Sequence, residues 1–165
     1  MKLPTLPPLS ALLVAAGLAL AGPSHAAPAD THATHAEHGG PASLQLNAGR
    51  KWQTDEALRQ AMANIRRAVA AALPEIHDKR LPAAGYGSLA KTVDSEVGNI
   101  LSHCQLAPAA DAQLHLVVAD LLAGAEQMAG KPQKAKRRDG ALKVLGALEK
   151  YAAYFDDPQF TPIAH

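Results

Sequence analysis

Apolar residues recur at three- and four-residue spacing in four separate segments of the chain, and this spacing constrains the fold more than any other feature. Such spacing places the apolar side chains along one side of an α-helix. No segment shows the strict alternation of apolar and polar residues that indicates a half-buried β-strand. Short connections with Pro and Gly separate the segments. The sequence therefore predicts an all-α fold, an up-down-up-down four-helix bundle over residues 51–158, followed by a loose tail over 159–165.

The ends of the helices are predicted from capping residues, prolines and glycines. We expect helices over residues 54–74, 88–103, 108–130 and 134–155. Thr54 is the expected N-cap of the first helix, and Pro74 is expected to end or bend it. Residues 77–87 then form a loop. Pro108 suits the first turn of the third helix, and Gly130 is the expected stop.

The first 26 residues have the features of a cleavable signal peptide. Lys2 provides a positive charge, an apolar stretch runs from Leu9 to Ala21, and small residues flank His25 at the expected cleavage site. The apolar stretch is too short to span a bilayer comfortably. The sequence therefore predicts a periplasmic protein that begins at Ala27 and keeps no stable membrane anchor. An uncleaved anchor is the alternative.

Charge and cysteine content exclude several classes of function. Lys2 is the only charged residue of the leader, so its removal changes the formal net charge from +1 to zero. Balanced charge argues against a protein that binds nucleic acid by bulk electrostatics. Cys104 is the only cysteine, which excludes an intramolecular disulfide and covalent attachment of a c-type haem. This cysteine is then buried, metal-bound, free or paired with another chain, so the oligomeric state stays open.

Residues 27–50 are predicted to form a disordered arm, because they are rich in Ala, Pro, Gly, His and Thr. His32, His35 and His38 recur in it at three-residue spacing, and imidazole is a ligand for copper, zinc and nickel. A flexible backbone can bring several imidazoles to one ion. Ordering that backbone costs ~1–2 kcal/mol per residue, so we expect modest affinity. The alternative is a solvated tail that contains histidines by chance.

A second candidate metal site lies at one end of the bundle. Alternating helix directions bring the start of the first helix close to Cys104 and His115, together with most of the aromatic residues. Met62 and His115 are expected at a similar height, ~10 Å along their helices. Thioether, thiolate and imidazole together suit Cu(I), so Met62, Cys104 and His115 are the candidate ligands. One alternative is that none of the three residues binds a metal: Met62 fills the core, Cys104 is buried and inert, and His115 is half-exposed. Another alternative is a non-covalent haem between Met62 and His115.

Other features favour binding over catalysis. The chain contains no glycine-rich phosphate loop, no Gly-x-Ser-x-Gly motif and no distinctive pair of carboxylates. Cys104 and His115 resemble a nucleophile and base, but no orienting residue is identifiable. Five basic residues between Lys131 and Arg138 are expected to form a solvated loop, since a helix carboxyl end favours positive charge, with an anionic partner as the alternative.

Several segments resemble a family of small exported proteobacterial proteins, the DnrO-like proteins. They are Leu46 to Asp55, Cys104 with the Leu-Ala-Pro that ends at Pro108, Gln113 to Leu116, and Tyr154 to Pro158. The resemblance covers about Leu46 to Phe160 and implies export and a helical bundle, without an activity. We therefore expect a non-enzymatic periplasmic protein that binds or buffers a transition metal, copper first and zinc second. An interaction module of the cell envelope, with a protein partner and no metal, is the rival interpretation.

Overall fold

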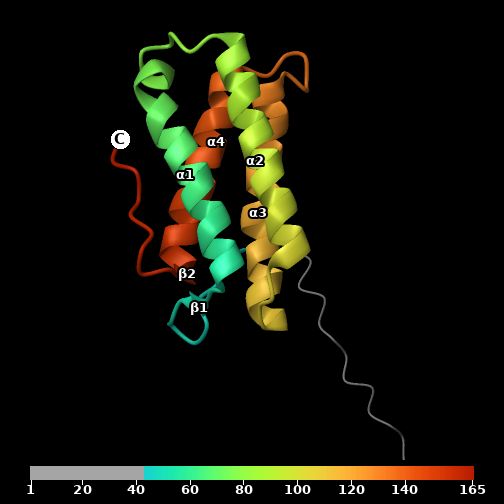
Figure 1. Cartoon of the computed structure of the whole chain (residues 1–165), viewed down its shortest axis with the longest axis vertical. Coiled ribbons are helices and arrows are strands. Elements are labelled where there is room, and N and C mark those ends of the chain that lie inside the picture. The colour runs from blue at the N-terminus through green and yellow to red at the C-terminus, as the bar shows by residue number, and fades with distance from the viewer. Residues whose placement is uncertain (1–42) are drawn as a thin grey trace, which may run out of the picture. The chain divides into compact units, whose positions relative to one another are not determined.

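The computed structural model describes residues 43–165, and these are mostly helical (Figure 1). The expected signal peptide and the three arm histidines lie outside the described residues. The elements are, in chain order, β1 (Trp52–Gln53), α1 (Glu56–His77), α2 (Ala83–His103), α3 (Pro108–Ala129), α4 (Arg137–Tyr154) and β2 (Phe155–Asp156). The prediction of an all-α fold with four helices is confirmed, apart from this short pair of strands. None of the helices in residues 43–165 is long and apolar enough to cross a membrane.

The predicted apolar stripes form the core. Leu58, Met62, Ile65 and Val69 of α1 are all at most 1% exposed and pack against the buried faces of the other helices. Helices that follow one another in the sequence pack most closely, whereas α1 and α4 make fewer contacts with each other. The seam between α1 and α4 is therefore the looser side of the bundle.

Two helix ends differ from the sequence prediction. The N-cap of α1 is Asp55 instead of Thr54, and its side chain accepts a hydrogen bond from the Leu58 amide at 2.8 Å. Pro74 does not end α1, which continues to His77 because buried Ile76 anchors the last turn in the core. Carboxylate caps and single core contacts of this kind override local propensity.

The second helix begins five residues earlier than expected, at Ala83 instead of Ser88. Tyr86 in the added turn is 6% exposed, so the buried stripe of α2 extends into the segment that was expected to be a loop. The stop of α3 is confirmed: Gly130 has a φ of +89°, and its amide bonds to the carbonyls of the last turn. That left-handed conformation suits glycine.

A two-stranded parallel sheet joins the two ends of the described chain, which corrects the expectation of no strands. Trp52 pairs with Phe155, and Gln53 pairs with Asp156. Segments this short carry no periodicity signal, so alternation of apolar residues cannot reveal them. The sheet holds the start of α1 against the end of α4.

The segments that precede and follow the bundle both pack against it. Residues 43–50 were expected to be the end of a disordered arm, and residues 159–165 were expected to be a loose tail. In residues 43–50, the Gln45 amide donates to Gln113 Oε1 at 2.7 Å, and Leu44 contacts the core. In residues 159–165, Phe160 and Ile163 contact the core, and Arg66 donates to the Thr161 carbonyl. The tail therefore lies against α1 and closes part of the looser seam.

Two glycines allow α3 and α4 to approach backbone to backbone. A Cβ atom on Gly140 would lie 2.6 Å from the Gly124 carbonyl oxygen and 2.8 Å from the Met128 nitrogen. A Cβ atom on Gly124 would in turn lie 2.8 Å from the Gly140 carbonyl oxygen. Carbon atoms do not approach polar backbone atoms this closely, so only glycine fits at both positions.

Candidate functional site

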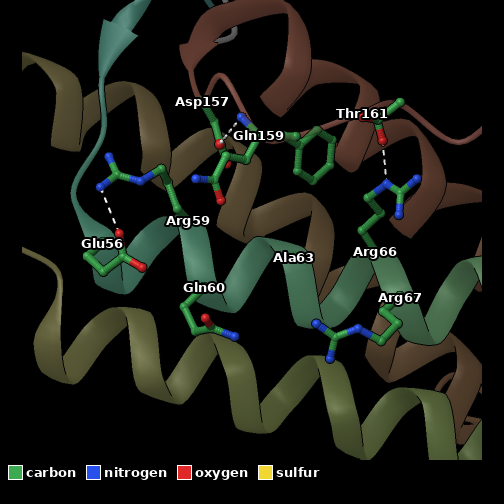
Figure 2. A pocket seen from close by; sticks show the side chains of 10 residues that line it. Glu56, Arg59, Gln60, Ala63, Arg66, Arg67, Asp157, Gln159 and Thr161 are labelled. Atoms are coloured by element: carbon green, nitrogen blue, oxygen red, sulfur yellow. Dashed lines mark hydrogen bonds and ion pairs between the residues drawn. The ribbon is translucent and has the colours of Figure 1, made fainter.

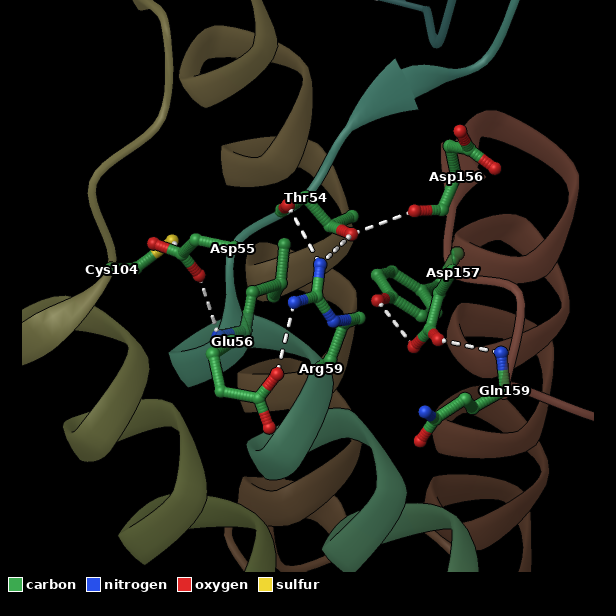
Figure 3. A network of polar contacts seen from close by, with 10 residues as sticks. Thr54, Asp55, Glu56, Arg59, Cys104, Asp156, Asp157 and Gln159 are labelled. Carbon is green, nitrogen blue, oxygen red and sulfur yellow. Dashed lines mark hydrogen bonds and ion pairs between the residues drawn. The ribbon is translucent and has the colours of Figure 1, made fainter.

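Asp55 joins the start of α1 to the connection between α2 and α3 (Figure 3). One carboxylate oxygen, Oδ1, caps α1 and lies 3.6 Å from the Cys104 sulfur. The other, Oδ2, accepts a hydrogen bond from the Gln105 amide at 2.5 Å. Cys104 is therefore held by a carboxylate over the first turn of α1. The sequence did not identify this contact, because the partners are 49 residues apart.

The surroundings of Cys104 keep its thiol protonated. Partial burial raises the pKa of Cys104 to about 12, and the charge and hydrogen bond of Asp55 and the charge of Asp111 add to the rise. The pKa of Asp55 is below its usual range, because hydrogen bonds from Gln105, Leu58 and Cys104 outweigh the opposing effect of desolvation. A thiol with such a high pKa is a poor nucleophile at neutral pH, which weakens the comparison with a Cys-His dyad.

Asp55→Asn is expected to speed the alkylation of Cys104 by iodoacetamide about tenfold or more near pH 8, because removal of the charge lowers the pKa of the thiol. Asparagine can still cap α1. The rate is measured by mass spectrometry between pH 7 and 10. Asp111→Asn is the matched control and should cause a smaller increase, since Asp111 contributes least to the shift. Equal rates in all three proteins would contradict a carboxylate-held thiol.

Cys104 and His115 line one cavity of about 220 Å³ at this end of the bundle. Its walls come from the end of α2 and the first turns of α3, with Ile100, Leu114 and Val118 as the apolar lining and Asp111 beside His115. The thiol and the imidazole therefore line the same cavity. Met62 is not among the residues that line this cavity, and it is fully buried in the core.

His115 is oriented by its own helix. Its side chain is 61% exposed, and Nδ1 lies 2.8 Å from the Asp111 carbonyl oxygen and 3.5 Å from the Asp111 carboxylate. A carbonyl oxygen only accepts hydrogen bonds, so this contact requires a proton on Nδ1, and Nε2 takes no part in it. This arrangement is the usual way in which a metal-binding histidine is held. Within residues 43–165, however, no group of three or more His, Cys, Asp and Glu side chains is arranged to hold a metal ion.

Most of the aromatic residues gather at the same end of the bundle, as the alternating helix directions predict. Tyr151 stacks on Phe155 with ring centroids 5.5 Å apart, and Phe160 packs edge-on against Tyr151 at 5.0 Å. The Tyr151 hydroxyl donates to Asp157 at 2.9 Å, and burial together with this bond raises the pKa of Tyr151. This cluster packs and fixes the chain near β2. The contact between Phe160 and Tyr151 was not predicted, because the tail was expected to be loose.

The basic segment between α3 and α4 has a structural use. Arg138 donates through Nε to the Ile76 carbonyl at the carboxyl end of α1, at 3.1 Å. Arg137 donates to the Met128 carbonyl at the end of α3. Carbonyls in the last turn of a helix lack partners within the helix and carry partial negative charge. Two of the five basic residues therefore cap helix ends, a more specific role than the solvated loop that was expected.

The small cavity at the bundle end is thus lined by one protonated thiol, one oriented imidazole and the carboxylate of Asp111, and Asp55 contacts the thiol from outside the cavity. A thiolate and an imidazole are ligand types that a soft metal ion accepts, provided that the thiol loses its proton. The resemblance to the DnrO-like proteins stays a prediction. Comparison with protein-family models, with curated proteins and with solved structures finds no match.

Proposed function

We propose that this is a non-enzymatic periplasmic protein that binds or buffers a transition metal, copper first and zinc second, on an up-down-up-down four-helix bundle. The observation that carries the proposal is the cavity shared by Cys104 and His115. A thiolate and a neutral imidazole are ligands that Cu(I) accepts with low coordination number. Met62 is left out of the proposed site, since reaching it would require opening the core.

The bonding of His115 supports this choice of ligand. With Nδ1 donating to the Asp111 carbonyl, Nε2 is the nitrogen that can bind a metal. The large exposed fraction of the side chain lets an ion from solvent reach it. Cys104 is half-buried, so its sulfur would bind from the inner side of the cavity. Asp55 stabilises the protonated form of the thiol and therefore limits the affinity at neutral pH.

The arm is proposed as an independent and weaker site. His32, His35 and His38 lie outside the described residues, so this part rests on their three-residue spacing. Imidazoles without sulfur suit Cu(II) and zinc better than they suit Cu(I). The two sites should therefore differ in the oxidation state of copper that they bind.

The test is a competitive titration of the protein with Cu(I) and with Cu(II). Three variants accompany it: Cys104→Ala, His115→Ala, and a variant in which the three arm histidines are alanine. We expect Cys104→Ala and His115→Ala to weaken Cu(I) binding at least tenfold each, with little effect on Cu(II). The arm variant should weaken Cu(II) alone. If only the arm variant weakens copper binding, the proposed bundle site does not exist and the protein is a low-affinity scavenger.

The affinity for Cu(I) should depend steeply on pH. Because the pKa of Cys104 is about 12, binding displaces one proton over the whole neutral range. The apparent affinity should then rise about tenfold per pH unit between pH 7 and 9. Titration against a chelator whose own pH dependence is known measures this slope. A Cu(I) affinity independent of pH in this range would show that the thiol is not a ligand.

The rival function is an interaction module of the cell envelope. Leu101 is 64% exposed and lines the same cavity, beside Ile100 and Leu114. A contiguous patch of exposed apolar residues is typical of a contact surface for another protein, and Leu101 would belong to that surface. The titration separates the two functions, because the interaction module predicts no copper binding by the parent protein or by any variant.

A further inference from the structure

A second cavity, of about 220 Å³, lies between α1 and the carboxyl-terminal tail, away from Cys104 (Figure 2). Arg59, Arg66 and Arg67 come from one side of α1, with Ala63 between them. The tail supplies the opposite wall, including Gln159 and Phe160. The metal proposal uses none of these residues.

The three arginines differ in how far their charges are compensated. Arg59 forms an ion pair with Glu56 at 2.9 Å, donates to Thr54, and is stabilised further by the charge of Asp157. Arg66 donates through Nε to the neutral Thr161 carbonyl, and Arg67 contacts the neutral side chain of Asn64 at 3.3 Å. Within the described part of the chain, no carboxylate lies within 4.0 Å of either guanidinium. Two adjacent positive charges therefore remain uncompensated at one end of the cavity.

The tail fixes the shape of this cavity. Phe160 packs edge-on against Tyr151, and the contact between Arg66 and the Thr161 carbonyl holds the chain beyond it against α1. The terminal nitrogens of Arg66 are not used in that contact and stay available for a ligand. Figure 2 shows the two guanidinium groups turned in different directions, so the exposed Arg67 side chain has to rotate toward Arg66 before one carboxylate or phosphate can accept hydrogen bonds from both. The methyl group of Ala63 and the ring of Phe160 offer an apolar surface beside them.

We propose that this cavity is a binding site for a small organic anion, with its carboxylate or phosphate group on Arg66 and Arg67 and its apolar part against Phe160. Arg59 is already paired and serves mainly to hold the wall near Glu56 and Asp157. The site needs no metal and is independent of the proposed copper site, so either proposal can fail without the other.

The experiment is a titration followed by the nitrogen-15 NMR signals of the backbone and of the arginine Nε groups, in about 0.15 M salt to limit non-specific attraction. The probes are inorganic phosphate, phenyl phosphate and benzoate. We expect saturable shifts at Ala63, Arg66 and Arg67, with phenyl phosphate or benzoate binding more tightly than inorganic phosphate. Whichever organic probe binds more tightly identifies the preferred anionic group. If neither phenyl phosphate nor benzoate binds more tightly than inorganic phosphate, the assignment to an organic anion is overturned.

Arg67→Gln is the decisive variant, because it removes one charge without touching the contact between Arg66 and the tail. We expect it to weaken binding about tenfold, the usual effect of losing a hydrogen bond to a charged group. Lys91→Gln is the matched control: it removes one exposed charge on α2, outside the cavity, and should leave the affinity unchanged. An equal loss in both variants, or no saturation at millimolar concentrations of any probe, would overturn the proposal.

Discussion

Replacing Gly140 with alanine is expected to lower the free energy of unfolding by about 1–3 kcal/mol, although alanine is the better helix former. The added methyl group would lie 2.6 Å from the Gly124 carbonyl oxygen and 2.8 Å from the Met128 nitrogen. Both atoms belong to the backbone of α3, so no side chain can turn away. The two helices must separate, and the contact on which the buried residues of α3 and α4 depend is lost.

Gly146→Ala is the matched control in the same helix. A Cβ atom there meets nothing within 4 Å, so only the gain in helix propensity remains. It should raise the free energy of unfolding by about 0.5–1 kcal/mol. Urea unfolding followed by circular dichroism measures both variants. If Gly140→Ala were as stable as Gly146→Ala, the close approach of α3 and α4 would be wrong.

Asp55→Ala is expected to lower the free energy of unfolding by about 2 kcal/mol at pH 7, the second large effect. The variant removes the cap of α1, and it leaves the Gln105 amide without the acceptor that it has at 2.5 Å. Asp94→Ala is the control, since it makes the same change at an exposed position on α2. It should change the stability by no more than about 0.5 kcal/mol.

The effect of Asp55 should also depend on pH. Hydrogen bonds hold the pKa of this carboxyl below its ordinary value in the folded protein, despite opposing desolvation. Its contribution is therefore complete above the unfolded pKa of about 3.9 and is lost as the pH falls through the lower folded value. Urea unfolding at pH 7 and at pH 2 should show a smaller difference between parent and Asp55→Ala in acid. An unchanged difference would contradict a pairing that depends on the ionised carboxylate.

The helices of this protein could be predicted from its sequence because each carries a continuous apolar stripe. The stop at Gly130 was predicted correctly as well, since a left-handed residue at the end of a helix favours glycine. The helix ends at Asp55, His77 and Ala83 were not predicted correctly, because they depend on tertiary contacts of Cys104, Ile76 and Tyr86. Local propensity carries no information about such contacts.

The candidate site was predictable only in part. Cys104 and His115 could be placed at one end of the bundle, because the helix directions and lengths fix their heights. Asp55 as the partner of Cys104 requires the path of the connection between α2 and α3, which no periodicity encodes. The docking of the tail escaped prediction for the same reason. Phe160 and Ile163 are isolated apolar residues, and a helical or strand pattern cannot be recognised from two positions.

The central claim, a copper site built from Cys104 and His115, is tested most directly by X-ray absorption at the copper edge of the Cu(I)-loaded protein. Nickel or zinc in the preparation does not interfere, because the edge selects copper. We predict one sulfur neighbour at about 2.2–2.3 Å and at least one imidazole nitrogen at about 2.0 Å, with the sulfur absent in Cys104→Ala. Copper surrounded only by nitrogen and oxygen in the parent protein would place the metal elsewhere and contradict the claim.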